Sequence, residues 1–219
     1  MVRFLTLTVL ASALTFGAAR AQDVPLSAPP PPMTEGGSAL LERMVRINQG
    51  LRSAKADVHV NVAFKTFPYI KHQLDGAYYY KQPDKQAAVF DTVPALASQF
   101  KKVFPYVEPP AAWPRSYTYG VASEDNGTTV FRLVPIKNSR IEHLDVRVDD
   151  ATATIQGYVW QYKDGGSISI DQRLSLTGGN YLMIEEIGHI DLPAYKAETT
   201  AEFSNYKVNV SVDDNVFAQ

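Results

Sequence analysis

The sequence predicts a mainly β domain in which one long antiparallel sheet curls and carries a few helices. From Lys55 onward, apolar residues alternate with polar ones, as they do in half-buried strands. Turn dipeptides such as Asn126-Gly127 and Gly178-Gly179 separate these runs. The runs number about nine to eleven, and strands joined mostly by tight turns form an antiparallel meander. A strongly twisted sheet of this size tends to curl.

The chain begins with the pattern of an export signal. A short basic start, MVR, precedes the apolar run FLTLTVLASALTFGAA, and Ala19-Arg20-Ala21 fits a small-x-small cleavage pattern. We therefore expect residues 1–21 to be a signal peptide. The mature protein would be secreted across the inner membrane and be soluble in the periplasm or outside the cell. An uncleaved anchor is the alternative, but the run is short for a span of ~20 residues.

A predicted tether, QDVPLSAPPPPMTEGG, occupies residues 22–37, and its four consecutive prolines favour an extended polyproline II spacer. We expect a single domain over residues 38–219. The chain has no cysteine, so we expect no disulfide, no thiolate site and no cysteine-linked lipid anchor. Its net charge is −2 and its pI about 6.1, which gives no field that would attract nucleic acid.

The domain is predicted to begin with a helix, followed by a strand. Ser38 can cap the run ALLERMVRINQGLRS, whose apolar residues recur at helical spacing and would pack on a core. In the next run, ADVHVNVAFK, the period changes to two. Its apolar residues share one face: Val58, Val60, Val62 and Phe64.

A β-hairpin is predicted over residues 76–90, GAYYYKQPDKQAAVF. The turn is Gln82-Pro83-Asp84, and KQAAVFD continues as the next strand. Tyr78 and Tyr80 share one face and Tyr79 lies on the other. Tyrosine suits a pleated surface because its ring is apolar and its tip polar.

The segment that follows, TVPALASQFKKVFPYVEPPAAWPRS, differs from the strands around it. Apolar residues at helical spacing favour a short amphipathic helix: Leu96, Phe100, Val103 and Phe104. Four prolines should break any regular structure after it: Pro105, Pro109, Pro110 and Pro114. We expect a helix-and-loop insertion between strands. The alternating pattern then returns and continues to YKAETTAEFSNYKVN near the end of the chain.

No motif of known catalytic chemistry is present. The four histidines lack the spacing of metal ligands, and the sequence has no nucleophile elbow, P-loop or dinucleotide fingerprint. Asp149-Asp150 and Glu185-Glu186 are adjacent carboxylates, but neighbours on a strand point to opposite faces and cannot act together. We therefore expect no enzyme, no metal and no cofactor. If helices fill the concave face incompletely, a hydrophobic pocket remains; if they fill it, no ligand binds.

The order of these segments resembles the LolA/LolB-type outer-membrane lipoprotein-sorting superfamily, and looks close to a poorly characterised bacterial branch of it. The resemblance rests on the ALLERM helix, the pattern G-x-Y-x-Y-K-x-P-D-K, the stretch DDATATIQGYVWQYKDGG (149–166) and the closing FSNYKVNVSVDDNVF. It implies an incomplete, half β-barrel covered by helices, with an interior that takes acyl chains. Residues 93–114 would be the lid region. LolA-type carriers have an arginine on an early strand, which ADVHVNVAFK and HQLDGAYYYK lack, so coupled lid opening is not carried over.

The sequence thus leads to the hypothesis of an exported, monomeric, non-enzymatic carrier of a lipid or of a lipoprotein acyl chain. The alternative is an envelope-stress sensor or interaction scaffold of the same fold, which binds an envelope protein and no lipid. The expected ligand-binding residues are apolar or aromatic and belong to the strands and the insertion: Val60, Val62, Phe64, Tyr78, Tyr80, Phe90, Phe100, Phe104 and Trp160.

Overall fold

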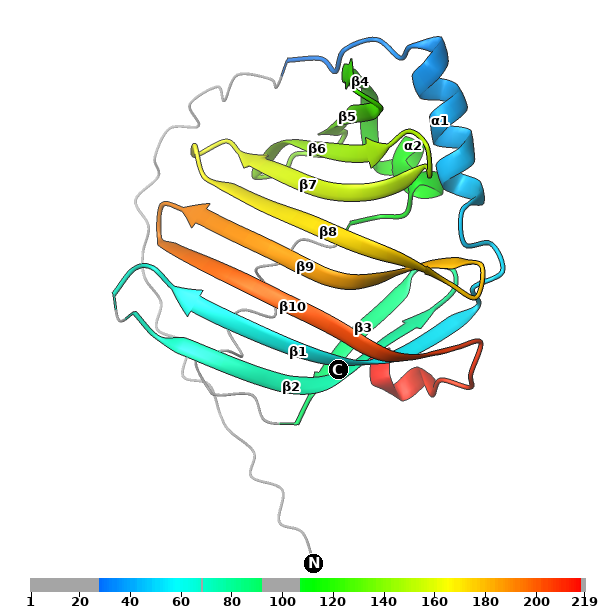
Figure 1. Cartoon of the computed structure of the whole chain (residues 1–219). Coiled ribbons are helices and arrows are strands. Elements are labelled where there is room, and N and C mark those ends of the chain that lie inside the picture. Colours follow the sequence, from blue (N-terminus) through cyan, green and yellow to red (C-terminus); the bar gives the residue numbers. More distant parts are fainter. Residues whose placement is uncertain (1–27, 68, 92–106, 218–219) are drawn as a thin grey trace, which may run out of the picture.

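Ten strands form one antiparallel sheet in the computed structural model, which describes residues 28–67, 69–91 and 107–217. The strand order is β3-β2-β1-β10-β9-β8-β7-β6-β5-β4, and the sheet curls strongly without closing (Figure 1). The strands are β1 (Ser53–Phe64), β2 (Lys71–Lys81), β3 (Lys85–Phe90), β4 (Tyr117–Asp125), β5 (Thr128–Pro135), β6 (Ile141–Asp149), β7 (Thr154–Tyr162), β8 (Ser167–Thr177), β9 (Asn180–Leu192) and β10 (Tyr195–Val208). This confirms the predicted mainly β, curved antiparallel fold.

The sheet joins the two ends of the domain. Strands that follow one another in sequence pair as hairpins, except β3 and β4, which form the two edges of the sheet. One further pairing, β1 with β10, connects the β1–β3 hairpins to the β4–β10 meander. Asn126 and Gly127 in the β4–β5 turn, and Gly178 and Gly179 in the β8–β9 turn, all have positive φ. Glycine adopts positive φ without steric cost, and asparagine adopts it more readily than most other residues do.

The long helix α1 (Glu35–Arg46) starts four residues earlier than the sequence predicted. Its N-cap is Thr34 rather than Ser38, because the Thr34 hydroxyl accepts a hydrogen bond from the Gly37 amide at 2.9 Å. Glu35 in the first turn and Arg46 in the last complement the helix dipole. Among the described residues, no helix has the length and apolarity needed to cross a membrane.

The proline-rich segment before β4 is more regular than the sequence suggested. A 3₁₀ turn, η2 (Pro110–Ala112), runs into the short helix α2 (Trp113–Ser116). The expectation that the prolines exclude regular structure was wrong here, because Pro110 and Pro114 occupy first-turn positions that need no amide donor. The amphipathic helix predicted from Leu96 to Phe104 lies outside the described residues. The chain ends in a 3₁₀ turn, η3 (Asp214–Phe217).

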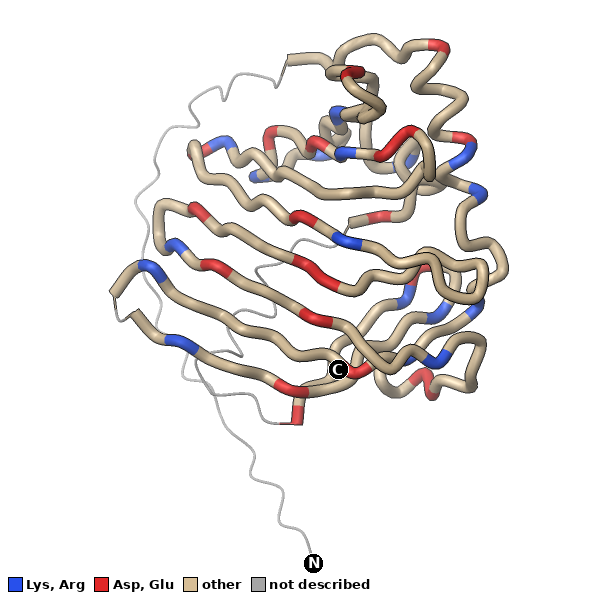
Figure 2. The backbone as a smooth tube through the Cα atoms, in the orientation of Figure 1, with Lys and Arg blue, Asp and Glu red and all other residues tan. Residues whose placement is uncertain are grey.

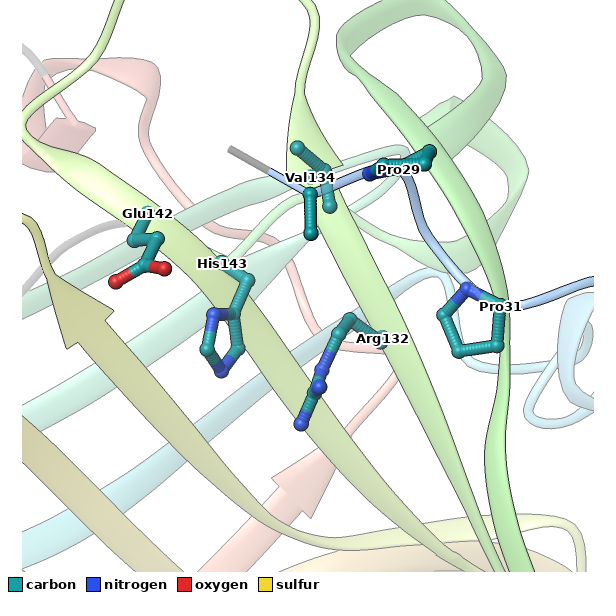
Figure 3. Close-up of a pocket in the computed structure, with 7 residues that line it drawn as sticks. Pro29, Pro31, Arg132, Val134, Glu142 and His143 are labelled. Carbon is teal, nitrogen blue, oxygen red and sulfur yellow. The ribbon is translucent and has the colours of Figure 1, made fainter. Parts of the chain in front are cut away.

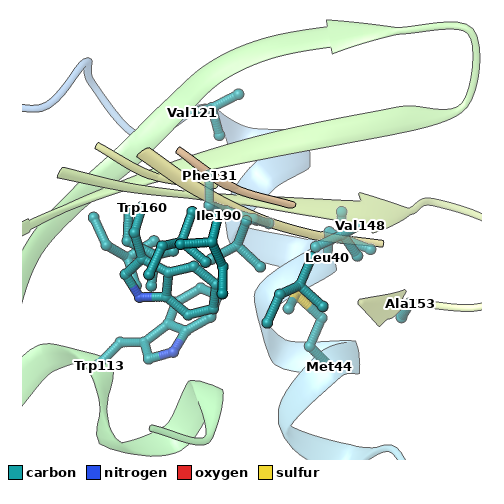
Figure 4. Close-up of a cluster of buried hydrophobic side chains, with 14 of the residues drawn as sticks. Leu40, Met44, Trp113, Val121, Phe131, Val148, Ala153, Trp160 and Ile190 are labelled. Atoms are coloured by element: carbon teal, nitrogen blue, oxygen red, sulfur yellow. The ribbon is translucent and has the colours of Figure 1, made fainter. Parts of the chain in front are cut away.

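The main core lies on the concave face of the sheet, beneath α1 and α2 (Figure 4). Leu40 and Met44 of α1 and Trp113 of α2 contact side chains that alternate inward along the strands. The largest fully buried side chains all belong to this cluster: Trp113, Trp160, Phe131, Leu133, Leu144, Ile168, Val146 and Val148. The alternation read from the sequence therefore separates a packed inner face from a charged outer face.

The last part of the predicted tether contacts the edge strand β4. The Val121 amide donates a hydrogen bond to the Pro32 carbonyl at 3.2 Å. A Cβ at Gly120 would lie 1.7 Å from the Pro31 oxygen, so only glycine lets the proline segment approach so closely. Residues 28–34 thereby cover part of an edge that would otherwise offer unpaired backbone groups.

Candidate functional site

The concave face has a second region that helices do not fill. A cavity of about 270 Å³ lies between the C-terminal part of α1 and the inner face of β1, β2 and β7–β10. Its lining mixes aliphatic side chains such as Met44 and Leu174 with five tyrosines: Tyr78, Tyr80, Tyr158, Tyr181 and Tyr206. The described residues that line it include no Lys, Arg, His, Asp or Glu. The cavity is therefore predominantly apolar, with hydroxyl and amide groups at its wall.

The register of β2 explains why two tyrosines face this cavity. Tyr78 lies opposite Ala56 of β1, and Tyr80 lies opposite Ala54. Both alanines are buried on the concave side, and their small side chains leave space above the strand. Tyr79, on the other face, has its ring 5.4 Å from the Lys55 ammonium. The sequence predicted that Tyr78 and Tyr80 share a face but not which face of the sheet it is. The register and the cavity lining show that it is the inner face.

Burial raises the pKa of several cavity tyrosines. It raises the pKa of Tyr78, and the neighbouring Tyr206 and Glu186 raise it further. Burial likewise raises the pKa of Tyr158 and of Tyr206. The Tyr206 hydroxyl donates to the Met183 carbonyl at 2.6 Å, and the Tyr78 hydroxyl donates to Oε1 of Gln86 at 3.2 Å. At neutral pH these groups are hydrogen-bond donors rather than phenolates.

One acidic residue lies beside the cavity. Glu186 of β9 pairs with Gln172 of β8 in the register and shares the concave face with Ile190. The Gln172 amide donates to Glu186 Oε2 at 3.4 Å. Burial raises the pKa of Glu186, and the hydrogen bond from Gln172 lowers it only in part. Its neighbour Glu185 points outward and pairs with Arg173 at 3.2 Å, so the two carboxylates face opposite sides, as the sequence predicted.

The predicted ligand-binding residues that the structure describes all lie on the concave face, but not in one place. Tyr78 and Tyr80 line the cavity. Phe64 and Trp160 are buried in the main core, and Val62 packs against that core. Val60 and Phe90 lie opposite Leu74 and Gly76 of β2 and are half-buried. Phe100 and Phe104 lie outside the described residues.

Sequence reasoning missed four residues that shape the cavity or its wall: Tyr158, Gln172, Glu186 and Tyr206. Tyr158 could have been found, because it is two residues from Trp160 and must share its face. Alternation also puts Glu186 on the face of Ile190, because the register of β8 with β9 is continuous between them. What alternation could not show is that a cavity lies beside Glu186, because that depends on which side chains meet across the sheet.

A second hollow lies on the outer face, where Pro29 and Pro31 of the segment before α1 lie near Arg132, Val134 and His143 (Figure 3). Arg132 Nε and Nη2 each donate to Asp145 at 2.7 Å. This bidentate pair raises the pKa of the Arg132 guanidinium. Because its guanidinium binds Asp145 through two hydrogen bonds, we interpret Arg132 as a structural residue rather than a ligand-binding one.

Ion pairs between strands characterise the outer face. Arg147 of β6 pairs with Asp171 of β8 across the intervening β7, and Arg173 of β8 pairs with Glu185 of the neighbouring β9. Figure 2 shows acidic and basic residues distributed along these strands. In the part of the chain that the structure describes, no group of three or more His, Asp or Glu side chains could hold a metal ion. The cavity on the concave face is therefore the best candidate for a functional site.

Several solved structures share this architecture. A DUF1329 family protein from Desulfovibrio piger aligns with a TM-score of 0.65 at 13% identity, over 85% of this chain and 98% of that protein. A LolA superfamily protein from Nitrosomonas europaea aligns with a TM-score of 0.58 at 13% identity, over 83% and 97%. A domain from Vibrio parahaemolyticus named for outer membrane lipoprotein sorting aligns with a TM-score of 0.59 at 13% identity, over 80% and 93%.

These likenesses establish the fold. No family model and no curated protein sequence matches the chain. At 13% identity the solved structures show a common architecture, and it extends over nearly the whole of each of them. The chain therefore has a LolA-like fold, in agreement with the resemblance found in its sequence.

Proposed function

We propose that this protein is an exported, non-enzymatic carrier that binds a hydrophobic ligand, a lipid or an acyl chain, in the cavity on its concave face. The observation that carries the proposal is the cavity of about 270 Å³, lined by apolar and tyrosine side chains, within a LolA-like fold. Ligand pockets usually measure roughly 300–1,000 Å³. A cavity just below that range suits one acyl chain better than a lipid with two.

Apolar burial would drive binding. Each methylene moved out of water contributes about 0.8 kcal/mol, so ten methylenes contribute about 8 kcal/mol before the cost of association. The names of two solved relatives, a LolA superfamily protein and a lipoprotein-sorting domain, support an envelope location for such a carrier. The signal-peptide pattern in residues 1–21 supports the same location.

Two aspartate variants on one strand test the proposal. Leu174 of β8 is half-buried and lines the cavity, whereas Leu176 is 60% exposed and does not line it. We expect Leu174→Asp to abolish uptake of a fluorescent fatty alcohol, because an ionised carboxylate in the cavity opposes entry of an alkyl chain. Leu176→Asp should bind as the wild type does. Phe64 is less suitable, because it belongs to the main core and a substitution there would also destabilise the fold.

Mass spectrometry of an organic extract from the purified mature protein complements the uptake assay. A stoichiometric lipid in the wild type and the Leu176→Asp variant, absent from Leu174→Asp, would support the carrier. A protein that carries no lipid and takes up no alcohol would contradict it. That result would favour the alternative derived from the sequence, an envelope sensor or interaction scaffold of the same fold.

A further inference from the structure

The cavity offers an alkyl chain an apolar lining and also has a polar wall, which consists of Gln172, Tyr78 and Tyr158 in the lining and of Glu186, which accepts a hydrogen bond from Gln172. We propose that this wall selects the polar group of the ligand, and that the preferred ligand is a cationic amphiphile with a protonated amine rather than a fatty acid. The inference rests on the proposed carrier function and specifies its ligand class. Four features of the structure support it.

The first feature is a carboxylate without a cationic partner. Among the residues that the structure describes, Glu186 forms no ion pair, and its one hydrogen-bond donor is the Gln172 amide at 3.4 Å. Arg173, the cation next to Gln172, points to the outer face and binds Glu185. Removing a carboxylate from water without a counter-charge is costly. An ammonium group supplied by a ligand would provide that counter-charge.

The second feature is the access that a ligand in the cavity has to the Glu186 carboxylate. The surrounding protein desolvates Glu186, but part of the residue remains exposed to solvent. Gln172, which donates to it, lines the cavity, and so do Tyr78 and Tyr158, which interact electrostatically with Glu186. On the β10 side, Glu186 lies opposite Ala201, whose small side chain leaves room above the strand. A polar group at the end of an alkyl chain in the cavity can therefore approach the carboxylate.

The third feature is a pair of tyrosines in the cavity lining. Tyr78 of β2 and Tyr158 of β7 both line the cavity, and each interacts electrostatically with Glu186. A cation near a tyrosine face is attracted by the ring quadrupole, and this attraction strengthens where water is excluded. The Tyr158 hydroxyl makes no hydrogen bond to any residue that the structure describes, so it is available to a ligand. A carboxylate beside aromatic rings is a favourable arrangement for an ammonium group.

The fourth feature is the absence of positive charge from the lining. No Lys, Arg or His is among the described residues that line the cavity. A fatty-acid carboxylate would therefore find no cation there and would be repelled by Glu186. The same wall attracts an amine and disfavours an anionic ligand of equal chain length.

Three probes of equal chain length separate the head-group preference from binding of the chain. Dodecylamine, 1-dodecanol and dodecanoate are titrated by calorimetry, each below its micelle concentration, into the full mature protein after lipid removal. We expect the wild type to bind dodecylamine about ten-fold or more tightly than dodecanoate, because a hydrogen bond to a charged group is worth more than a neutral one. Dodecanol should lie between them.

Adjacent glutamates provide a matched pair of variants. Glu186→Gln keeps the shape of the side chain and removes its charge, so it should bind dodecanol as before and lose the preference for amine over carboxylate. Glu185→Gln, which changes the outward carboxylate paired with Arg173, should keep the preference. Circular dichroism checks that both variants fold.

The outcomes separate the two proposals. Binding of dodecanol without an advantage for dodecylamine in the wild type, or an advantage that survives in Glu186→Gln, overturns the amine inference and leaves the carrier intact. Failure of all three probes to bind overturns the carrier and the inference together. A preference for dodecylamine that disappears only in Glu186→Gln supports both.

Discussion

The concave face has two halves that are built from the same kind of alternating strand but differ in how completely side chains fill them. In the filled half, which is the main core, helices α1 and α2 pack on the sheet, and Trp113, Phe131 and Trp160 are almost completely buried (Figures 1 and 4). In the cavity half, which surrounds the cavity at the C-terminal end of α1, the inner residues Tyr78 and Tyr80 remain half-buried.

Side-chain chemistry explains the difference. The filled half presents large side chains without polar atoms, such as Phe131 and Leu144, to Trp113 and to α1. The cavity half combines small residues such as Ala54 with tyrosines, whose hydroxyls need hydrogen-bond partners and resist complete burial. Binding of an alkyl chain requires the second kind of surface, while the first provides the stability that an unfilled cavity reduces.

The largest expected effect tests this division. Trp113→Ala should lower the free energy of unfolding by about 3–5 kcal/mol, because a fully buried ring is replaced by a void. The hydrogen bond from its indole to the Glu108 carbonyl, 3.0 Å long, would also be lost. Tyr80→Ala, in the cavity half, should cost less than about 2 kcal/mol. Urea denaturation measures both, and equal losses would mean that the cavity half is packed as tightly as the filled half.

A smaller effect is expected where the proline segment covers the edge of the filled half. Gly120→Ala should lower the free energy of unfolding by about 1–3 kcal/mol, because its Cβ would collide with the Pro31 oxygen. Gly50→Ala is the control: a Cβ there meets nothing within 4 Å, so the change should stay within about 0.5 kcal/mol. Thermal unfolding of both variants measures the difference, and an unaffected Gly120→Ala variant would show that the proline contact contributes nothing to stability.

Local patterns predicted much of the fold. Alternation placed Val58, Val60, Val62 and Phe64 on one face, and the register confirms that they share it. The turn at Asn126-Gly127 joins β4 to β5 as its dipeptide indicated. These features depend on neighbouring residues, so one sequence is enough to find them.

Long-range features could not be predicted in the same way. The pairing of β1 with β10 brings Phe64 opposite Ala197, and alternation carries no information about which strand is the partner. For the same reason the sequence could not show that Tyr80 lines a cavity while Trp160 is sealed in the core. The position of a tertiary cavity depends on which side chains meet across the sheet.

The smallest of the three stability effects concerns Glu186 in the lipid-free protein. Burial raises its pKa above the 4.5 of an ordinary glutamate, so the folded state holds its proton more tightly than the unfolded state does. The stability that this proton contributes is complete below pH 4.5 and is lost as the pH rises through the folded-state pKa. Tyr78 and Tyr158, the titratable groups that interact with Glu186, have raised pKa values and stay neutral throughout.

Glu186→Gln should therefore unfold at nearly the wild-type free energy at pH 4, and be more stable than the wild type by about 1 kcal/mol at pH 7. Urea denaturation across this range measures the difference, with Glu185→Gln as the control, because its carboxylate faces outward to Arg173. A constant difference between Glu186→Gln and wild type at both pH values would mean that Glu186 is not desolvated in the folded protein. The cavity would then lack the unpaired charge that distinguishes it from the filled half.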